Sequence, residues 1–311
     1  MKRLAVTALK IAVSATLLWV LFHRIALAPV LASLARFSVE AALVVMGLAF
    51  LQILLFALRW QLVARVCGAP LPWGARLRLV FIGLFFNQTL PSSIGGDAMR
   101  VWLSSRLGVP PSRAFSSVAA DRFAALIVLL GLSLATLPLF YVQVSDTLLR
   151  HGLTGALAAG AAGFILLLTG GLTMERWLQS WRVTAPFGLV IADLRRLFLL
   201  PAGLVAMLLS LTLHLMSVAV IFLIARRLGI GLTPSAALVL VPPILLVMAF
   251  PVTIAGWGLR EGAMVVALAQ IHVAAPDALA LSILFGLLQI AVSLPGAVLW
   301  LQRHERLPHQ G

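Results

Sequence analysis

Residues 91–100 read PSSIGGDAMR, and residues 251–260 read PVTIAGWGLR. Proline, serine or threonine, isoleucine, glycine and arginine coincide in the two stretches without a gap, at an offset of 160 positions. Each stretch lies between a short apolar segment and a second short helical pattern. The flanking segments are 79–94 and 97–108 in the first case, and 236–256 and 257–270 in the second. This order is typical of a re-entrant helical hairpin, because broken backbone at membrane depth must be buried in protein or line a cavity. The alternative is one kinked spanning helix in each place.

The composition is that of an integral membrane protein. Apolar residues make up 62% of the 311 residues and charged residues 10%, whereas soluble domains carry about 25% charged residues. This excludes an ordinary soluble enzyme, a disordered tail and a fibrous protein. The long apolar runs lack strand-like alternation, so they predict helices and not barrel strands. The single Cys67 excludes an internal disulfide and a thiolate zinc cluster.

Six segments come close to the roughly 20 apolar residues that a transmembrane helix needs. They are residues 4–22, 41–58, 115–140, 153–172, 200–224 and 278–301. The first is longer than the roughly 7–15 residues of a signal-peptide core, so we expect it to be retained as a helix. The sequence predicts an all-α polytopic membrane protein with about six transmembrane helices and two re-entrant helical hairpins.

The charge distribution predicts an orientation. The chain carries 23 Lys and Arg against 9 Asp and Glu, a formal net charge of +14. If both hairpins are re-entrant and both termini are cytoplasmic, fifteen basic residues fall inside and six outside, with Arg59, Arg76 and Arg100 among the fifteen. That bias follows the positive-inside rule. We therefore expect a multi-pass protein of the bacterial inner membrane whose positive charge meets lipid phosphates and not nucleic acid.

The matching broken segments also predict an internal repeat. The same offset roughly aligns the second predicted span with the fifth and the third with the sixth. One membrane domain, 1–311, would then consist of two halves, 1–140 and 153–301, each with three crossings and a hairpin. Because three is odd, the halves are expected to have opposite orientations. Inverted repeats with broken segments at matching positions indicate the central site of a transporter.

The first broken segment offers chemistry that suits an anion. Gly95 and Gly96 are expected to leave backbone N–H groups free at a helix start, where the helix dipole favours negative charge. Asp97 suits the cap of that helix. Arg100, one turn further on, suits phosphate because its planar guanidinium bonds two oxygens. The alternative is that the glycines only make the turn and Arg100 reaches the membrane interface.

The second broken segment repeats this chemistry with Gly256, Gly258, Arg260 and Glu261. We favour an anion site for the symmetric pair of arginines, Arg100 and Arg260, although either arginine alone fits an interfacial role equally well.

Other polar residues lie within or beside apolar segments. Asp121 and Arg122 fall early in the third span, where ionisable residues are costly and usually face an interior or a cavity; the alternative is the cytoplasmic interface. Asp121 is expected to pair with Arg100 or Arg122. Asn87 is expected to bond carbonyls freed by Pro91, or a ligand headgroup. A neutral histidine bonded to a neighbouring helix is favoured for His214 over a proton relay.

These observations define a set of candidate residues. The predicted lipid-headgroup-binding residues are Asn87, Ser93, Gly95, Gly96, Asp97, Arg100, Asp121, Arg122, Thr253, Gly256, Gly258, Arg260 and Glu261. The predicted hinge residues are Pro91 and Pro251. Phosphate-loop, serine-hydrolase and HExxH signatures are absent from the sequence, so we expect no catalytic residues, no cofactor and no metal.

The ordered motifs around Asn87, 91–100, Asp121–Arg122 and 251–261 resemble the lysylphosphatidylglycerol synthase transmembrane region, also called the flippase-like domain family. The N-terminal part of the multiple peptide resistance factor is its best-known member. The resemblance covers nearly the whole chain and implies a polytopic domain with re-entrant helices that moves a lipid between leaflets. Only a short polar tail follows Trp300, so the resemblance does not imply attachment of lysine to phosphatidylglycerol.

Three functions fit these predictions. The first is a lipid flippase-like transporter that moves a phosphate-bearing phospho- or polyprenyl-linked lipid between leaflets. The second is a membrane enzyme acting on a lipid phosphate, and the third is an accessory subunit of a lipid or glycolipid pathway that transports nothing. The expected partners are a membrane lipid and the bilayer; a homo-oligomer and a separate lipid-modifying enzyme are left open.

Overall fold

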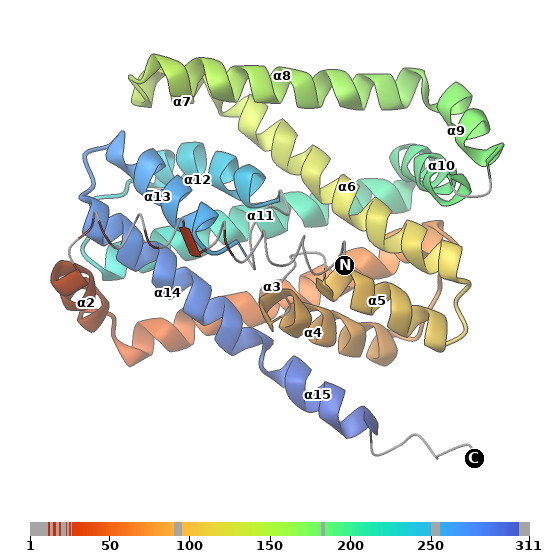
Figure 1. The fold of residues 1–311 in the computed structure, drawn as a ribbon, viewed down its shortest axis with the longest axis horizontal. Coiled ribbons are helices and arrows are strands. Elements are labelled where there is room, and N and C mark those ends of the chain that lie inside the picture. The colour runs from red at the N-terminus through yellow and green to blue at the C-terminus, as the bar shows by residue number, and fades with distance from the viewer. Residues whose placement is uncertain are drawn as a thin grey trace.

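The structure, a computed structural model, describes residues 27–89, 95–181, 184–249 and 256–304, with single positions between 12 and 25. Every regular element in these ranges is helical (Figure 1), and no strand occurs in them. The helices are α2 (Leu27–Ala35), α3 (Val39–Val66), α4 (Trp73–Thr89), α5 (Gly95–Arg106), α6 (Pro111–Ala135), α7 (Leu137–Gln143), α8 (Thr147–Thr169), α9 (Gly171–Gln179), α10 (Ala185–Leu199), α11 (Pro201–Arg227), α12 (Pro234–Ala249), α13 (Leu259–Ala269), α14 (Ala275–Ser293) and α15 (Pro295–His304).

Five helical segments are long and apolar enough to cross a membrane: α3, α6, α8, α11 and the stretch Ala275–Gln302, which joins α14 to α15. Their 23 to 28 residues correspond to about 35–42 Å at 1.5 Å per residue, more than the roughly 30 Å of a hydrocarbon core. They confirm five of the six predicted spans and a multi-pass, helical membrane protein. The predicted span 4–22 lies almost wholly outside the described residues.

Two of the predicted spans are interrupted at a proline. The segment predicted at 115–140 divides into α6 and α7, and Pro138 lies in the first turn of α7. The segment predicted at 278–301 divides into α14 and α15, and α15 begins at Pro295. Proline has no amide hydrogen and fits best in the first turn of a helix, so each of these long helices restarts there.

Capping residues and left-handed glycines fix several helix ends. The side chains of Ser38 and Asp146 accept backbone N–H groups at the starts of α3 and α8, at 3.2 and 3.1 Å. Gly68 and Gly229 follow the ends of α3 and α11 with φ angles of 67° and 75°, a conformation that favours glycine. The helices that lie at equivalent places in the two predicted halves therefore end in the same way.

The long helices α3 and α11 pack against each other through the centre of the molecule (Figure 1). Two pairs of shorter helices, α4 with α5 and α12 with α13, pack beside them. Helix α5 contacts α6, and α13 contacts α14. The pairs also cross over: α4 contacts α14 and α15, whereas α12 contacts α6 and α7. Each short pair therefore rests on long helices from both ends of the sequence.

Helices α4 and α5 approach each other closely at two glycines. A Cβ atom added to Gly96 would lie 1.9 Å from the carbonyl oxygen of Gly83 and 2.6 Å from the side-chain oxygen of Asn87. That oxygen accepts the N–H of Gly96 at 2.8 Å. Only glycine fits at Gly96, because any side chain there would push α5 away from α4.

Helix α8 lies along one edge of the molecule and is almost wholly exposed (Figure 1). It contacts α6, α7 and α9 only lightly, and most of its surface is apolar. The sequence analysis did not predict α9 and α10, which follow α8 and pack against each other. Helix α10 docks on α6 through the buried Asp193, which accepts the hydroxyl of Ser116 at 2.6 Å.

Candidate functional site

A buried cluster of charge surrounds the start of α5. Its centre is Asp97, which accepts Arg100 Nη2 at 2.7 Å from within α5. The same carboxylate accepts Arg122 from α6 through two bonds, Nε at 2.7 Å and Nη2 at 3.1 Å. The sequence analysis expected Asp97 to cap the helix; instead, its carboxylate joins α5 to α6 by holding two arginines.

A second carboxylate extends this cluster to α3. Asp121 accepts Arg59 through two bonds of 2.9 and 3.0 Å, and Arg100 Nη1 approaches it at 3.4 Å. Arg59 also donates to Ser210 of α11 at 3.3 Å. The predicted pairing of Asp121 with Arg100 is confirmed, and Arg59 is a partner that the sequence analysis missed.

Aromatic rings cover the buried guanidinium groups. The guanidinium of Arg100 lies 5.0 Å from the ring centroid of Phe56 and 4.7 Å from that of Trp60. The guanidinium of Arg76, on α4, also lies over Trp60, 4.5 Å from the ring centroid. The negative faces of aromatic rings attract cations, so these rings stabilise arginines that are shielded from water.

Arg59, Arg76 and Arg100, which the charge count assigned to the cytoplasmic side, are buried in the interior of the protein. All three lie inside helices and are at most 4% exposed. Each is retained in the interior by a carboxylate, an aromatic ring or a backbone carbonyl; Arg76 Nη2, for example, donates to the carbonyl of Ala69 at 2.8 Å. Buried charges persist only with such partners.

The cluster has more positive than negative charge. Arg59, Arg76, Arg100 and Arg122 supply four guanidinium groups, whereas Asp97 and Asp121 supply two carboxylates, so the six side chains carry a net charge of +2. Burial and the positive charge of Arg100 lower the pKa of Arg76. An additional anion near the cluster would offset this excess.

Arg122 connects the cluster to the surface. Its side chain is 47% exposed, whereas that of Arg100 is 2% exposed. Arg122 and Asp97 lie together in the wall of a crevice of about 600 Å³ between α5 and α6. Burial raises the pKa of Asp97, but Arg100 and Arg122 outweigh this effect, so the pKa of Asp97 lies below its usual value. Asp97 is therefore ionised, and its carboxylate forms an ion pair with Arg122.

The second predicted site, at the start of α13, is compact and neutral. Glu261 Oε1 accepts Arg260 Nη2 at 2.6 Å and Nε at 3.0 Å, and Ser282 of α14 bonds both residues at 3.1 Å. Glu261 Oε2 accepts the backbone N–H of Gly258 at 2.6 Å, at the helix start. Arg260 is 2% exposed and Glu261 is 0% exposed.

Among the described residues, the neighbours of Arg260 pack closely around its guanidinium. Its guanidinium lies 4.6 Å from the ring centroid of Trp257. A Cβ atom added to Gly286 of α14 would lie 2.2 Å from Arg260 Nη2. Arg260 is therefore enclosed between α13 and α14, with its charge balanced by the next residue in the chain.

The structure brings most of the predicted residues into these two groups. Asn87, Gly95, Gly96, Asp97, Arg100, Asp121 and Arg122 gather at the start of α5, whereas Gly256, Gly258, Arg260 and Glu261 gather at the start of α13. Gly96 does not present the expected free amide, because Asn87 accepts its N–H. The other predicted positions, Pro91, Ser93, Pro251 and Thr253, lie outside the described residues.

Two further polar contacts lie away from the cluster. His214 Nε2 lies 3.0 Å from the carbonyl of Ala125 on α6, which confirms the prediction that His214 bonds a neighbouring helix. Asp193 lies 3.6 Å from Arg113 and Arg196, in addition to its bond with Ser116. The sequence analysis missed Asp193; its one signal was an isolated acid between apolar residues of the stretch 185–199.

Comparison with known proteins identifies relatives of the chain. The family model described as "Lysylphosphatidylglycerol synthase TM region" matches residues 7–296. A "UPF0104 membrane protein" of Methanothermobacter thermautotrophicus is 23% identical over 248 residues, which cover 68% of this chain and 69% of that protein. No solved structure matches the chain significantly.

Proposed function

The chain belongs to the family of lysylphosphatidylglycerol synthase transmembrane regions, and from this premise we propose that it is a lipid flippase-like transporter. Its substrate is a phosphate-bearing lipid, phospho- or polyprenyl-linked, which it moves between the leaflets of the bacterial inner membrane. It acts by binding and release and performs no chemistry on the lipid.

The observation that carries this proposal is the positive cluster at the start of α5. The cluster has a net charge of +2, and three of its four arginines are shielded from water, so little solvent screens their attraction for an anion. Arg122 is half exposed in the crevice between α5 and α6, so a headgroup can reach it from the membrane. A planar guanidinium bonds two phosphate oxygens at once, which suits a lipid phosphate better than a point charge does.

Asp97 acts as the internal competitor of the lipid phosphate. It holds Arg122 with the two-bond geometry that a phosphate would use. When a phosphate binds Arg122, Asp97 keeps its bond to Arg100, so the exchange leaves no carboxylate without a partner. The ion pairs of Asp121 with Arg59 and Arg100 remain unchanged during this exchange.

We further propose that α4–α5 and α12–α13 are re-entrant hairpins of an inverted repeat. The matched ends of α3 and α11, the equivalent short pairs and their crossed packing on long helices of the other half support this arrangement. Two similar halves of opposite orientation can exchange which side of the membrane is open. Both termini lie in the cytoplasm in this arrangement.

A translocation assay in liposomes tests the proposal. The purified protein is reconstituted with a fluorescent phosphatidylglycerol, and an impermeant reductant quenches the outer leaflet. We expect the protein to expose the inner-leaflet lipid to quenching, and Arg122→Ala to slow this strongly. Arg150→Ala is the matched control, because Arg150 is a partly buried arginine that bonds the carbonyl of Tyr141, far along the chain from the cluster. Protein-free rates with the wild type would refute transport of this lipid.

A further inference from the structure

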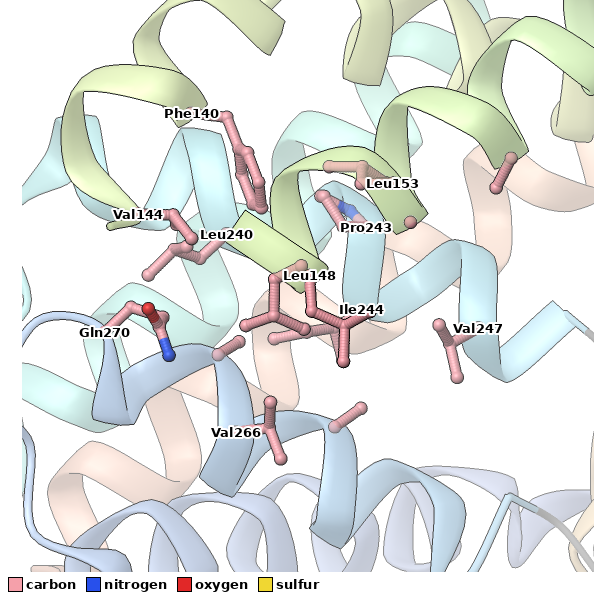
Figure 2. A pocket seen from close by; sticks show the side chains of 15 residues that line it. Phe140, Val144, Leu148, Leu153, Leu240, Pro243, Ile244, Val247, Val266 and Gln270 are labelled. Carbon is pink, nitrogen blue, oxygen red and sulfur yellow. The ribbon is translucent and has the colours of Figure 1, made fainter. Parts of the chain in front are cut away.

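An apolar groove separates α8 from the body of the molecule. Its first part, about 440 Å³, lies between α7, α8, α12 and α13; Figure 2 shows Phe140, Leu153, Ile244 and Val266 around it. Its second part, about 490 Å³, lies between α6, α8 and α12. The two parts adjoin, because both are lined by Leu153, Ala156, Pro243 and Val247.

The lining of this α8 groove is too apolar to bind water. Gln270 is the one polar side chain among the described residues that line the first part, and the second part has none. A water molecule needs two to four polar partners to enter a cavity, so the groove favours hydrocarbon. Helix α8 is a candidate membrane span, so the hydrocarbon available beside it is lipid.

Small residues on α8 keep the groove open. Gly152, Ala156, Gly160 and Gly163 follow each other at three or four positions, and all four line the groove. Residues with this spacing lie on one face of a helix. A Cβ atom added to Gly163 would meet nothing within 4 Å, so free space begins directly at the backbone there.

Helix α6 connects the groove to the positive cluster. Arg122 lines the crevice beside Asp97, and Leu126 and Leu130 line the groove. These residues are spaced four apart, so they lie on one face of α6, with Leu130 about 12 Å along the axis from Arg122 at 1.5 Å per residue. A lipid with its phosphate at Arg122 can therefore place an acyl chain along Leu126 and Leu130, on the same face of α6.

We propose that the α8 groove binds an acyl chain of the phospholipid whose phosphate lies at Arg122. The inference deepens the proposed function, on which it rests for the identity of the headgroup. Hydrocarbon gains little hydrophobic free energy by leaving the bilayer for an apolar groove, so the affinity comes from the phosphate. The groove selects by shape, through close packing of the chain between α8 and α12.

Photo-crosslinking of the full-length protein in liposomes tests this inference. The probe is phosphatidylglycerol with a diazirine near the end of one acyl chain, at a small fraction of the total lipid. We expect adducts concentrated on groove residues of α8 and α12. Gly163→Trp fills the groove and lowers these adducts severalfold. Ala156→Phe, in the part that both halves of the groove share, is the second filling variant.

Gly155→Trp is the matched control. Gly155 lies on the same helix, is exposed, and has nothing within 4 Å of an added Cβ atom, but it does not line the groove. This variant should keep wild-type adducts. Arg122→Gln should lower groove adducts about tenfold, because glutamine lacks both the charge and the two-pronged geometry with which arginine binds a phosphate.

Two outcomes overturn the inference: adducts spread evenly over all exposed helices, or adducts unchanged in both filling variants. A failure of the proposed transport function can be distinguished from a failure of the acyl-chain site. Translocation without groove adducts refutes the acyl-chain site alone. Groove adducts that depend on Gly163, in a protein that does not translocate lipid, refute the transport function and leave the binding site in place.

Discussion

The starts of α5 and α13 carry an arginine at equivalent positions, but their surroundings differ in charge and access. Arg100 shares two carboxylates with Arg59 and Arg122, in a cluster with a net charge of +2 that reaches the surface. Arg260 is balanced by Glu261 and enclosed on all sides that the described residues define. The same residue in the same kind of helix start can thus belong to the proposed anion site or to a structural lock, the closed pair of Arg260 with Glu261, and its partners decide which.

The largest expected effect concerns orientation, and it is all or none. Gly74 lies at the start of α4, and Leu107 directly follows the end of α5. If the two helices form a re-entrant hairpin, an impermeant thiol reagent should label Gly74→Cys and Leu107→Cys from the same side of the membrane. If the two halves are inverted, Ala274→Cys, between α13 and α14, should be labelled only from the other side. Opposite accessibility of Gly74→Cys and Leu107→Cys would refute the re-entrant hairpin.

The native Cys67 should not interfere with this labelling. Cys67 is 1% exposed, and burial together with the nearby Asp193 raises the pKa of its thiol. Thiolates are the reactive form, so Cys67 should remain unlabelled in the folded protein near neutral pH and react only after unfolding. Cys67→Ala serves as the control background.

The next largest effect is on stability and separates the lock from the anion site. Glu261→Ala leaves Arg260 buried without its carboxylate, which should cost about 3–5 kcal/mol. Asp97→Ala should cost less, because Arg100 keeps Asp121 and Arg122 is half exposed. Unfolding by denaturant in detergent micelles measures both. The double variant Arg260→Met/Glu261→Gln should recover much of the loss; equal losses in Glu261→Ala and Asp97→Ala would contradict the distinction.

A smaller effect compares the two close approaches made by glycine. Gly96→Ala should cost about 1–3 kcal/mol, because its Cβ meets the rigid backbone oxygen of Gly83. Gly286→Ala should cost a similar amount, because its Cβ meets the guanidinium of Arg260, which Glu261 and Ser282 hold in place. Gly131→Ala is the control, since nothing lies within 4 Å of its added Cβ and alanine favours the helix. Thermal unfolding in micelles ranks the three, and a cost for Gly131→Ala as large as for Gly96→Ala would contradict the packing argument.

The smallest effect is a shift in lipid affinity. Asp97→Asn removes the competing charge from Arg122, so phosphatidylglycerol should stabilise this variant more than the wild type, with an affinity about tenfold higher, or about 1.4 kcal/mol. Glu261→Gln, the equivalent change in the lock, should gain no lipid affinity. The rise in melting temperature with added lipid measures the affinity. An equal rise in affinity in both variants would show that the effect is not specific to the cluster at the start of α5.

The sequence predicted the parts of the fold that depend on local pattern. Apolar length located five spans, and the short helical patterns at 97–108 and 257–270 correspond to α5 and α13. Helices α9 and α10 escaped prediction because they are short and contain several polar residues among the apolar ones. The predicted bounds also ended a span at residue 58, so Arg59 was placed beyond its end although α3 continues to Val66.

The partners of the charged residues depended on packing that the sequence does not display. Arg59 and Asp121 are 62 positions apart, and only the contact of α3 with α6 brings them together. Arg260 and Glu261 are consecutive, and consecutive residues on a helix do not normally face each other. Glu261 reaches Arg260 because its carboxylate folds back to the helix start, where it also accepts the N–H of Gly258. The neutral state of the second site follows from that local turn.

From the loose attachment of α8 we expect the protein to respond to the thickness of its bilayer. This helix spans 23 residues, about 35 Å at 1.5 Å per residue, and touches its neighbours only lightly. A helix longer than the surrounding hydrocarbon tilts to match it, at a cost of only a fraction of a kcal/mol per Å of mismatch. Thin membranes would tilt α8 and thick membranes would bring it upright, and with each change the wall that α8 presents to α12 would move. We therefore expect the lipid composition of the membrane to set the width of the groove, without any ligand bound to the protein.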